Sequence, residues 1–480
     1  MSSIKRLFAV IVVLFLFVGI NIAKGTEADR VSIYTTSADQ SRLFHHSSTS
    51  VSKKTEKRPD IKLQPQLTYQ EIDGFGAAIT GSTAYNLLQM TPEDRTAFLK
   101  EVFDSQSGLG YSYIRISIGC SDFSLSEYTC CDTPGIENFS LQPEDTLYVI
   151  PILKEILSIH PAIKIMASPW TAPRWMKVEN LETRKPYDSW TSGQLNPEYY
   201  ADYALYFVKY IQSMKAAGID ITTVTIQNEP LNRGNSTSMY MTWQEQRDFI
   251  KSALGPAFEE FGIESKIVVF DHNFNYDEIR DQEQYPLRIY EDTAAAQYID
   301  GAAYHAYGGR SSELDLIHRS RPDKNLYFTE MSIGDWNPLF EDDLMWFMSE
   351  VGIGTLIRWN KAIIVWNLML DAGHGPNRPG GCLQCYGAVD IGEDYKTLKR
   401  NSHYYLIGHL SKVIKPGAIR IGVSEFDNKG IEYVAFKNPD ASYGVVLLNR
   451  SNEDRELLIG DEKESLEVSV PSRSIVSLSW

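Results

Sequence analysis

Eight short runs rich in β-branched and aromatic residues recur along the chain, and each ends in polar, Gly or Pro residues. Stretches with the apolar spacing of amphipathic helices separate most of them, at residues 91–103, 143–159, 197–217 and 242–261. This alternation predicts a (β/α)8 TIM barrel, with a doubly wound open sheet as the alternative. The predicted strands cover residues 72–80, 111–119, 163–170, 221–230, 266–273, 298–307, 325–333 and 361–370.

The two ends of the chain have a different pattern. Residues 31–38 and the segment from about 417 to 480 alternate apolar and polar positions, which is typical of antiparallel strands. We expect one small β-sandwich, built from both ends and packed beside the barrel. Residues 39–58, rich in Ser and Lys, are expected to form a loop within it. The predicted limits are 26–66 and 413–480 for the sandwich and 67–412 for the catalytic barrel.

The first residues have the pattern of an export signal. Lys5 and Arg6 precede an uncharged run at residues 7–23, and small residues follow near Gly25. We expect cleavage after Gly25, which makes residues 1–25 a signal peptide and places the protein in the periplasm, on the cell surface or outside the cell. An uncleaved anchor is the alternative, although the run is shorter than the ~20 residues that span a bilayer. No later segment is apolar enough to span, so no stable membrane insertion is expected after cleavage.

Composition and charge narrow the class of protein. The 480 residues include 46 basic and 62 acidic side chains, a formal charge of −16. A nucleic-acid binder needs a dense basic surface, so nucleic acid is not an expected partner. With 43% hydrophobic and 22% charged residues, the chain is an ordinary globular protein rather than a disordered or fibrous one. We expect a monomer.

The chain has five cysteines, and in an exported protein they indicate disulfides. Cys382 and Cys385 form a lone C-x-x-C pair, which we interpret as a disulfide that tightens a loop rather than a zinc or redox site. Cys120, Cys130 and Cys131 are left unassigned. The histidines at the predicted strand ends lack metal-ligand spacing, so neither a metal nor another cofactor is expected.

The catalytic groups of a TIM barrel lie at the carboxyl ends of its strands. Glu229 ends the fourth predicted strand and Glu330 the seventh, each after an apolar run. A salt bridge to a barrel arginine could explain either glutamate alone, but two at one barrel mouth suit glycoside cleavage. One would protonate the leaving oxygen and the other would attack the anomeric carbon.

Other strand ends offer sugar contacts. Tryptophan faces stack on pyranose rings, and Asp or Asn binds paired hydroxyls. Arg115, inside the second strand, would keep a strand-end carboxylate ionised. The candidate binding residues at these strand ends are Asp122, Trp170, Trp175, Asn228, His305, Tyr307, Trp366 and Asn367.

Five ordered motifs together resemble glycoside hydrolase family 30, the family of lysosomal glucosylceramidase and of microbial β-1,6-glucanases. The resemblance covers residues 70–411 and implies a retaining mechanism, with Glu229 as acid/base and Glu330 as nucleophile. It also implies sugar binding through Asp122, Trp170, Asn228, Tyr307 and Trp366, and less directly through His305. The motifs are Glu71-Ile72-Asp73-Gly74-Phe75-Gly76, Ala167-Ser168-Pro169-Trp170-Thr171-Ala172-Pro173, Gln227-Asn228-Glu229-Pro230, Thr329-Glu330 and Trp366-Asn367-Leu368.

The paired-cysteine loop distinguishes the branches of this family. Gly380-Gly381-Cys382-Leu383-Gln384-Cys385 resembles the β-1,6-glucanase branch, and the loops around the predicted mouth are polar. We therefore expect a secreted enzyme that cleaves β-1,6-linked glucan, with endo or exo action left open. Glucosylceramidase is the main alternative, and a xylan-directed enzyme or a carbohydrate-binding protein without turnover are weaker ones. Because one glutamate must be protonated and the other ionised, activity should be bell-shaped on the acidic side of neutral.

Overall fold

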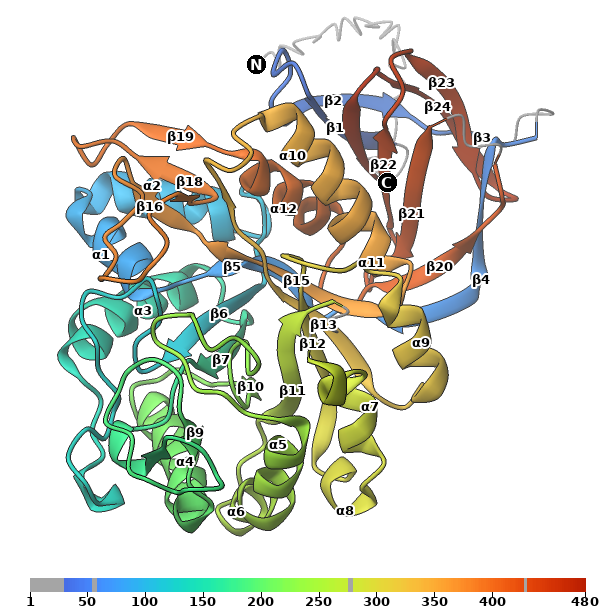
Figure 1. The fold of residues 1–480 in the computed structure, drawn as a ribbon. Helices are drawn as coiled ribbons and strands as arrows, with labels where there is room; N and C mark the ends of the chain where they lie inside the picture. The colour runs from blue at the N-terminus through green and yellow to red at the C-terminus, as the bar shows by residue number, and fades with distance from the viewer. Residues whose placement is uncertain (1–29, 54–57, 275–278, 427–429) are drawn as a thin grey trace, which may run out of the picture.

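The eight predicted strand runs form one closed parallel barrel in the computed structural model (Figure 1), which describes residues 30–53, 58–274, 279–426 and 430–480. The last barrel strand pairs with the first, with Ala362 opposite Gly74, so the predicted TIM barrel is confirmed and the open sheet is wrong. The predicted signal peptide, residues 1–25, lies outside the described residues. In chain order the barrel strands are β5 (Gly74–Ala78), β6 (Tyr113–Ile118), β7 (Lys164–Pro169), β10 (Thr223–Thr225), β11 (Lys266–Asn273), β12 (Ile299–His305), β13 (Asn325–Glu330) and β15 (Asn360–Asn367).

Helices follow the strands and form the outer layer of the barrel. Thr91 caps the start of α2, because its hydroxyl accepts the backbone N–H of Asp94. Thr242 and Glu245 form a reciprocal capping box at the start of α5. The helices are α1 (Gly81–Gln89), α2 (Pro92–Phe103), α3 (Ile150–Ile159), α4 (Tyr200–Ala216), α5 (Trp243–Phe249), α6 (Gly255–Glu260), α7 (Tyr285–Tyr290), α8 (Thr293–Ala296), α9 (Glu313–Ser320), α10 (Phe340–Phe347), α11 (Gly354–Leu356) and α12 (Ser402–Val413).

The barrel interior changes from apolar to polar along the strands. An apolar cluster that includes Tyr113, Val268 and Ile364 forms part of its core. Nearer the carboxyl ends, the buried side chains include Arg115 and Asp271 instead. A charged layer in a closed barrel is costly unless its members are paired, so this is the end at which to look for chemistry.

Strands from both ends of the chain form the second domain, as predicted. The ten strands are hydrogen-bonded in the order β2-β1-β25-β22-β21-β20-β4-β23-β24-β3. β4 pairs with β20 on one side and β23 on the other, so it belongs to both layers of the sandwich and then leads into the barrel. The strands are β1 (Arg30–Ser37), β2 (His45–Ser50), β3 (Ser52–Lys53), β4 (Ile61–Glu71), β20 (Ile419–Val423), β21 (Ile431–Lys437), β22 (Tyr443–Asn449), β23 (Arg455–Gly460), β24 (Glu464–Val470) and β25 (Ser474–Ser479).

The prediction of a loop over residues 39–58 is wrong in part. Residues 45–50 form β2, which pairs antiparallel with β1 at the edge of the sheet. Every residue of β2 is exposed, so its sequence, His45-His46-Ser47-Ser48-Thr49-Ser50, lacks the apolar alternation of a half-buried strand. Backbone pairing to β1 forms this strand without a buried face.

Helix α12 lies between the barrel and the sandwich (Figure 1). The imidazole of His409 on this helix is fully buried, with one nitrogen 2.7 Å from Ser477 Oγ and the other 2.8 Å from Thr36 Oγ1. Thr36 is in β1 and Ser477 in β25, so one side chain of the barrel contacts the first and last strands of the sandwich.

Short paired strands lie in the loops at the carboxyl end of the barrel. The predicted disulfide between Cys382 and Cys385 is present in the loop after β15, while Cys120, Cys130 and Cys131 are buried thiols. Across the described part of the chain, no helix is both long and apolar enough to cross a bilayer. The short strands are β8 (Lys177–Val178), β9 (Gln194–Leu195), β14 (Ile333–Gly334), β16 (Met369–Asp371), β17 (Cys385–Tyr386), β18 (Val389–Ile391) and β19 (Leu398–Arg400).

Candidate active site

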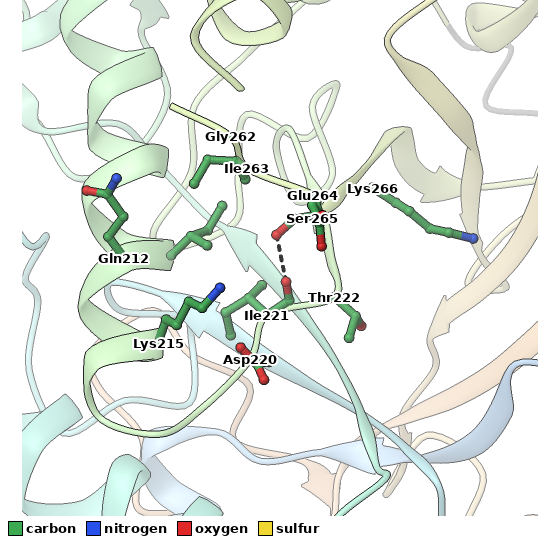
Figure 2. Close-up of a pocket in the computed structure, with 11 residues that line it drawn as sticks. Gln212, Lys215, Asp220, Ile221, Thr222, Gly262, Ile263, Glu264, Ser265 and Lys266 are labelled. Atoms are coloured by element: carbon green, nitrogen blue, oxygen red, sulfur yellow. Dashed lines mark hydrogen bonds between the residues drawn. The ribbon is translucent and has the colours of Figure 1, made fainter. Parts of the chain in front are cut away.

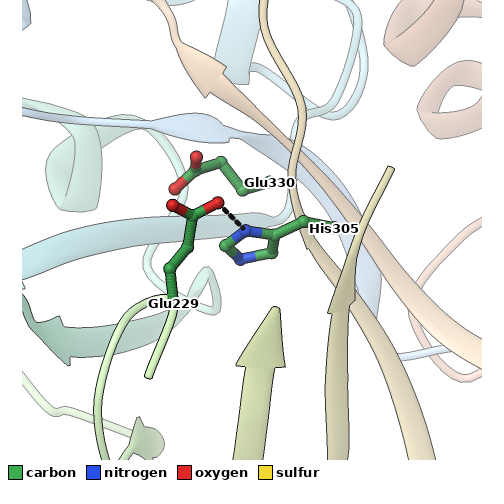
Figure 3. Close-up of side chains that lie close together, drawn as sticks. All are labelled: Glu229, His305 and Glu330. Atoms are coloured by element: carbon green, nitrogen blue, oxygen red, sulfur yellow. Dashed lines mark hydrogen bonds and ion pairs between the residues drawn. The ribbon is translucent and has the colours of Figure 1, made fainter. Parts of the chain in front are cut away.

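Glu229 and Glu330 meet at the carboxyl end of the barrel, together with His305 (Figure 3). One carboxylate oxygen of each glutamate and one ring nitrogen of His305 all lie within 4.8 Å of one another. The two glutamates are 7% and 6% exposed, so each carboxylate is largely removed from water but still reachable from the barrel mouth. Two strands that are far apart in sequence thus bring the predicted carboxyl pair together.

The backbone at Glu229 has an unusual conformation. Strand β10 ends at Thr225, and Glu229 has a φ of 46°, in the left-handed region that non-glycine residues rarely adopt. Its N–H donates to the carbonyl of Asp271 on the next strand, at 2.9 Å. This conformation costs on the order of 1–3 kcal/mol and is characteristic of functional positions.

Arg115 on β6 is fully buried and connects the two halves of the site. Its guanidinium donates to Glu330 Oε2 at 2.6 Å and to Asp271 Oδ2 at 2.8 Å. It also donates to Asn228 Oδ1 at 2.8 Å, which fixes the amide that precedes Glu229. The prediction that Arg115 pairs with a strand-end carboxylate is confirmed, and it pairs with two.

His305 lies behind Glu229 rather than at the open face of the site. Its Nδ1 is 3.3 Å from Glu229 Oε1 and its Nε2 is 3.0 Å from Asp271 Oδ1, and the ring is fully buried. Both nitrogens therefore face carboxylates of this chain. His305 acts on Glu229 directly.

These contacts distribute the charges of the site. Burial alone would lower the pKa of His305, but the charge of Glu330 and the hydrogen bonds to Asp271 and Glu229 raise that pKa to about 9. Burial acts against ionisation of Glu229, yet the hydrogen bond to His305 brings the pKa of Glu229 to about 2. Burial raises the pKa of Glu330, and the charges of His305 and Arg115 only partly oppose it. The pKa values of the two glutamates are split, with the lower one on Glu229.

Asp271 was not among the residues predicted from sequence, although it is the hub of this network. It is fully buried on β11 and accepts hydrogen bonds from Thr225 and Thr329, at 2.7 and 2.6 Å, besides its contacts with Arg115 and His305. These contacts, above all the charge of Arg115, overcome burial and hold its pKa well below the usual range. The sequence carries only part of the signal: Asp271 follows the apolar run of residues 267–270, as Glu229 and Glu330 follow theirs, but the run does not tell whether Asp271 or His272 faces the barrel axis.

Trp170 and Trp366 form an aromatic wall beside Arg115. Their rings stack with centroids 5.2 Å apart, and the Arg115 guanidinium lies 4.9 Å from the centroid of Trp170. The buried Nε1 of Trp170 and Nδ2 of Asn228 have no hydrogen-bond partner among the residues that the structure describes. Buried donors of this kind are costly unless a ligand or water completes them, so both are suited to hydroxyl groups of a substrate.

Asp122 and Tyr307 complete the set. The Tyr307 hydroxyl donates to Glu330 Oε1 at 3.0 Å, while 41% of the residue is exposed at the mouth. Burial and the nearby charges of Glu330 and Glu229 raise the pKa of Asp122 to about 8. The predicted catalytic and binding residues other than Trp175 and Asn367 thus belong to one cluster. Asn367 is buried, and its Oδ1 accepts a hydrogen bond from Thr80 Oγ1 at 2.6 Å. Trp175 is different, because its indole N–H donates to the Cys131 carbonyl and its ring packs on the core.

The donor set Glu229, His305 and Glu330 is also the kind of cluster that could hold a cation. Here the other oxygen of Glu330 accepts from the Arg115 guanidinium, and His305 is shared between Glu229 and Asp271. Positive groups of the protein therefore already neutralise these carboxylates. The arrangement is that of an acid–base site rather than a metal site.

A separate pocket of about 500 Å³ lies at the opposite end of the barrel (Figure 2). It is formed by the end of α4 and by the residues that lead into β10 and β11, including Lys215, Asp220 and Lys266. It contains none of the clustered site residues, and its only hydrogen bond drawn in Figure 2 is from Ser265 Oγ to the Ile221 carbonyl, at 2.6 Å.

Comparison with protein families gives two adjacent matches. The Glycosyl hydrolase family 30 TIM-barrel domain matches residues 72–414, and the Glycosyl hydrolase family 30 beta sandwich domain matches residues 417–478. The first match corresponds to the barrel and the second to the C-terminal strands of the sandwich.

Individual relatives cover most of the chain. The lysosomal acid glucosylceramidase of Mus musculus is 32% identical over 440 residues, 88% of this chain and 83% of that protein. An endo-1,6-beta-D-glucanase of Neurospora crassa is 30% identical over 414 residues, 83% and 82% of the two chains. The solved structure of an endo-beta1,6-glucanase is 57% identical, with a TM-score of 0.91, and covers 94% of this chain and 99% of that one.

Proposed function

The chain belongs to glycosyl hydrolase family 30 and is a glycoside hydrolase, and from that premise we propose that it cleaves β-1,6-linked glucan with retention of configuration. The observation that carries the choice of substrate is the 57% identity, over 94% of the chain, to an endo-beta1,6-glucanase. Identity to the murine glucosylceramidase is 32%. Glucosylceramide is therefore the alternative substrate.

The separation of the carboxylates supports a retaining mechanism. Carboxyl groups ~5–5.5 Å apart act on the anomeric carbon directly, whereas an inverting pair stands ~6.5–9.5 Å apart to admit a water. Oxygens of Glu229 and Glu330 lie within 4.8 Å of each other, which belongs to the first class. A water between them would have little room in the first step.

In the first step, an oxygen of Glu330 attacks the anomeric carbon as the bond to the leaving sugar oxygen breaks. Glu229 gives that oxygen a proton, so the shortened glucan departs as an alcohol and a glucosyl ester remains on Glu330. In the second step Glu229, now ionised, takes a proton from water as the water oxygen attacks the same carbon and releases Glu330. The net change is one water consumed and one glycosidic bond broken.

Other residues would position the reacting sugar. The unpaired donors Asn228 Nδ2 and Trp170 Nε1 are suited to bind its hydroxyl oxygens, and Trp366 supports the Trp170 ring. Tyr307 and Arg115 each donate to one oxygen of Glu330, which orients the nucleophile. Asp122 would form a hydrogen bond with a hydroxyl group of the same sugar.

Product analysis tests the proposal. The purified chain is incubated in parallel with a soluble β-1,6-glucan and with glucosylceramide in detergent, and the anomer formed first is identified by proton NMR. We expect β-anomeric oligosaccharides or glucose from the glucan alone. Release of glucose from the lipid alone would contradict the proposed substrate. An α-anomer as the first product would contradict the retaining mechanism.

A Glu330→Gln variant separates a hydrolase from a protein that only binds carbohydrate. The variant keeps the shape of the site but lacks the nucleophile, so we expect turnover to fall by on the order of 10⁴-fold with glucan binding retained. Glu462→Gln, between β23 and β24 of the sandwich and with its side chain 82% exposed, is a control with the same chemical change far from the carboxyl pair. If the unaltered chain binds glucan as well as the Glu330→Gln variant does but shows no turnover, the proposal is contradicted.

We also propose that the protein is exported through residues 1–25 and acts as a monomer. The charged start and the apolar run at residues 7–23 support export. N-terminal sequencing of the mature protein, together with its mass in solution, tests both points; an N-terminus upstream of residue 26 or a larger particle would contradict them.

A further inference from the structure

A strap, defined here as residues 375–386 of the loop after β15, crosses one side of the barrel mouth. At its start, Asn86 of α1 donates to the Gly375 carbonyl at 2.8 Å. At its end, β17 pairs with β14, which directly follows the strand that carries Glu330. The strap, which follows the eighth barrel strand, is therefore also attached to segments that follow the first and the seventh barrel strands.

Arg378 is the attachment in the middle of the strap. The residue is 3% exposed, and its guanidinium donates to the Ser121 carbonyl at 2.9 Å, to Glu127 Oε1 at 3.2 Å and to Ser236 Oγ at 3.5 Å. Ser121 and Glu127 follow β6, and Ser236 follows β10. All three acceptors belong to other loops. The guanidinium therefore holds the strap to the loops after β6 and β10 and does not stabilise the strap internally.

These contacts converge on Asp122. The residue before it gives its carbonyl to Arg378, and a Cβ on Gly381 would come within 2.6 Å of the Asp122 carbonyl oxygen. The residue after it, Phe123, packs with Trp366 and with the disulfide cysteines. The strap thus contacts the backbone next to Asp122, whose carboxyl group lies close enough to Glu330 for the charge of Glu330 to raise its pKa.

We propose that Arg378 is a positioning residue for the substrate: through Ser121 it fixes the Asp122 carboxyl group so that it can hydrogen-bond to hydroxyl groups of the glucosyl unit whose bond is cleaved. This inference rests on the proposed function and adds to it a residue that does not touch the sugar but sets the position of one that does. A hydrogen bond depends on direction as well as distance, so a small displacement of the Asp122 backbone weakens the contact. The charge of Arg378 also opposes the rise in the pKa of Asp122 that burial causes.

A double-mutant cycle on a soluble β-1,6-glucan tests this route of action. The variants are Arg378→Gln, Asp122→Asn and the two combined, with kcat and KM measured separately. If Arg378 acts through Asp122, each single variant loses at least about tenfold in kcat/KM and the combined variant is no worse than Asp122→Asn. Losses that multiply in the combined variant would overturn the proposal.

Two further variants keep the outcome interpretable. Leu383→Ala removes an exposed side chain at the tip of the same strap, 70% exposed, and should leave kcat and KM unchanged. Arg378→Lys keeps the charge but not the forked geometry, and it replaces Arg378→Gln in the cycle if that variant does not fold. An unaltered chain inactive on glucan would instead contradict the proposed function, whereas an active chain with multiplying losses contradicts only the role of Arg378.

Discussion

The Nδ1 atom of His305 lies 3.3 Å from Oε1 of Glu229, and this contact puts one proton between the two side chains. With the pKa of His305 near 9 and that of Glu229 near 2, the proton is on the imidazole in the ligand-free site. It can reach Glu229 by moving along the hydrogen bond. The proton needed by the leaving oxygen is therefore present over a wide range of pH.

This arrangement fixes the sign of each limb of the pH–activity profile. As pH falls, Glu330, whose pKa is raised by burial, takes up a proton and ceases to be a nucleophile. As pH rises towards about 9, the His305–Glu229 pair loses its proton and the acid is absent. We expect a bell-shaped profile of kcat/KM whose basic limb lies above neutral, higher than the acidic optimum expected from sequence.

A His305→Gln variant should move the basic limb to lower pH by about one unit or more, because Glu229 must then hold the proton itself. The measurement is kcat/KM on a β-1,6-glucan across the pH range, compared with His318→Gln, a histidine on α9 outside the site. An unchanged basic limb in the His305 variant would show that the shared proton is not used.

Removal of Glu229 should depend on the leaving group. In a Glu229→Gln variant the departing sugar alkoxide receives no proton, so we expect kcat on glucan to fall by roughly 10²–10⁴-fold. An aryl β-gentiobioside with an acidic phenol needs no such proton, and formation of the glycosyl-enzyme from it should be nearly normal. Equal losses on both substrates would argue against Glu229 as the acid.

Arg115 should be essential for stability as well as for activity. An Arg115→Met variant leaves the buried Asp271 and Glu330 without their cation, which typically costs about 3–5 kcal/mol. Arg450→Met is the matched control, since Arg450 pairs with Glu432 at 3.1 Å with 53% of its side chain exposed and should contribute less than about 1 kcal/mol. Denaturant midpoints followed by tryptophan fluorescence compare the two, and equal shifts would contradict the argument.

The interface between the two domains should weaken in acid. Burial lowers the pKa of His409 to about 3, whereas an unfolded histidine titrates near 6.5. Between these values only the unfolded chain binds the proton, so the free energy of unfolding should fall by about 1.4 kcal/mol per pH unit as pH decreases below 6.5. A His409→Gln variant should lose that dependence; midpoints at several pH values that remain parallel in both proteins would exclude it.

The order of the barrel strands, the disulfide and the two glutamates could all be predicted from sequence, because each depends on a local pattern. Asp271 could not be assigned in the same way. The pairing of β11 with β12 shifts register between Phe270 and His272, and Phe270 and Asp271 both have positive φ. This irregularity breaks the alternation of a strand, so sequence alone does not tell whether Asp271 or His272 faces the barrel axis.

The contacts of Arg378 could not be predicted from the sequence either. Its partners lie more than a hundred residues away along the chain, in loops whose conformations depend on one another. The Cys382–Cys385 pair marked the loop as constrained but carried no information on what the constraint holds. Sequence patterns identify the ends of the strands. Which loops contact one another is seen only in the folded barrel.

Strand β1 pairs with β25, so β1 cannot complete its pairing in the sheet until β25 has been synthesised. During synthesis the barrel has all eight strands before β25 leaves the ribosome, while β1 presents an unpaired edge. We expect the barrel to form first and the sandwich to close only after β25 has been synthesised. Nascent chains stalled before residue 474 should thus resist protease over the barrel yet remain cleavable in β1, so the closed sandwich reports that β25 is present.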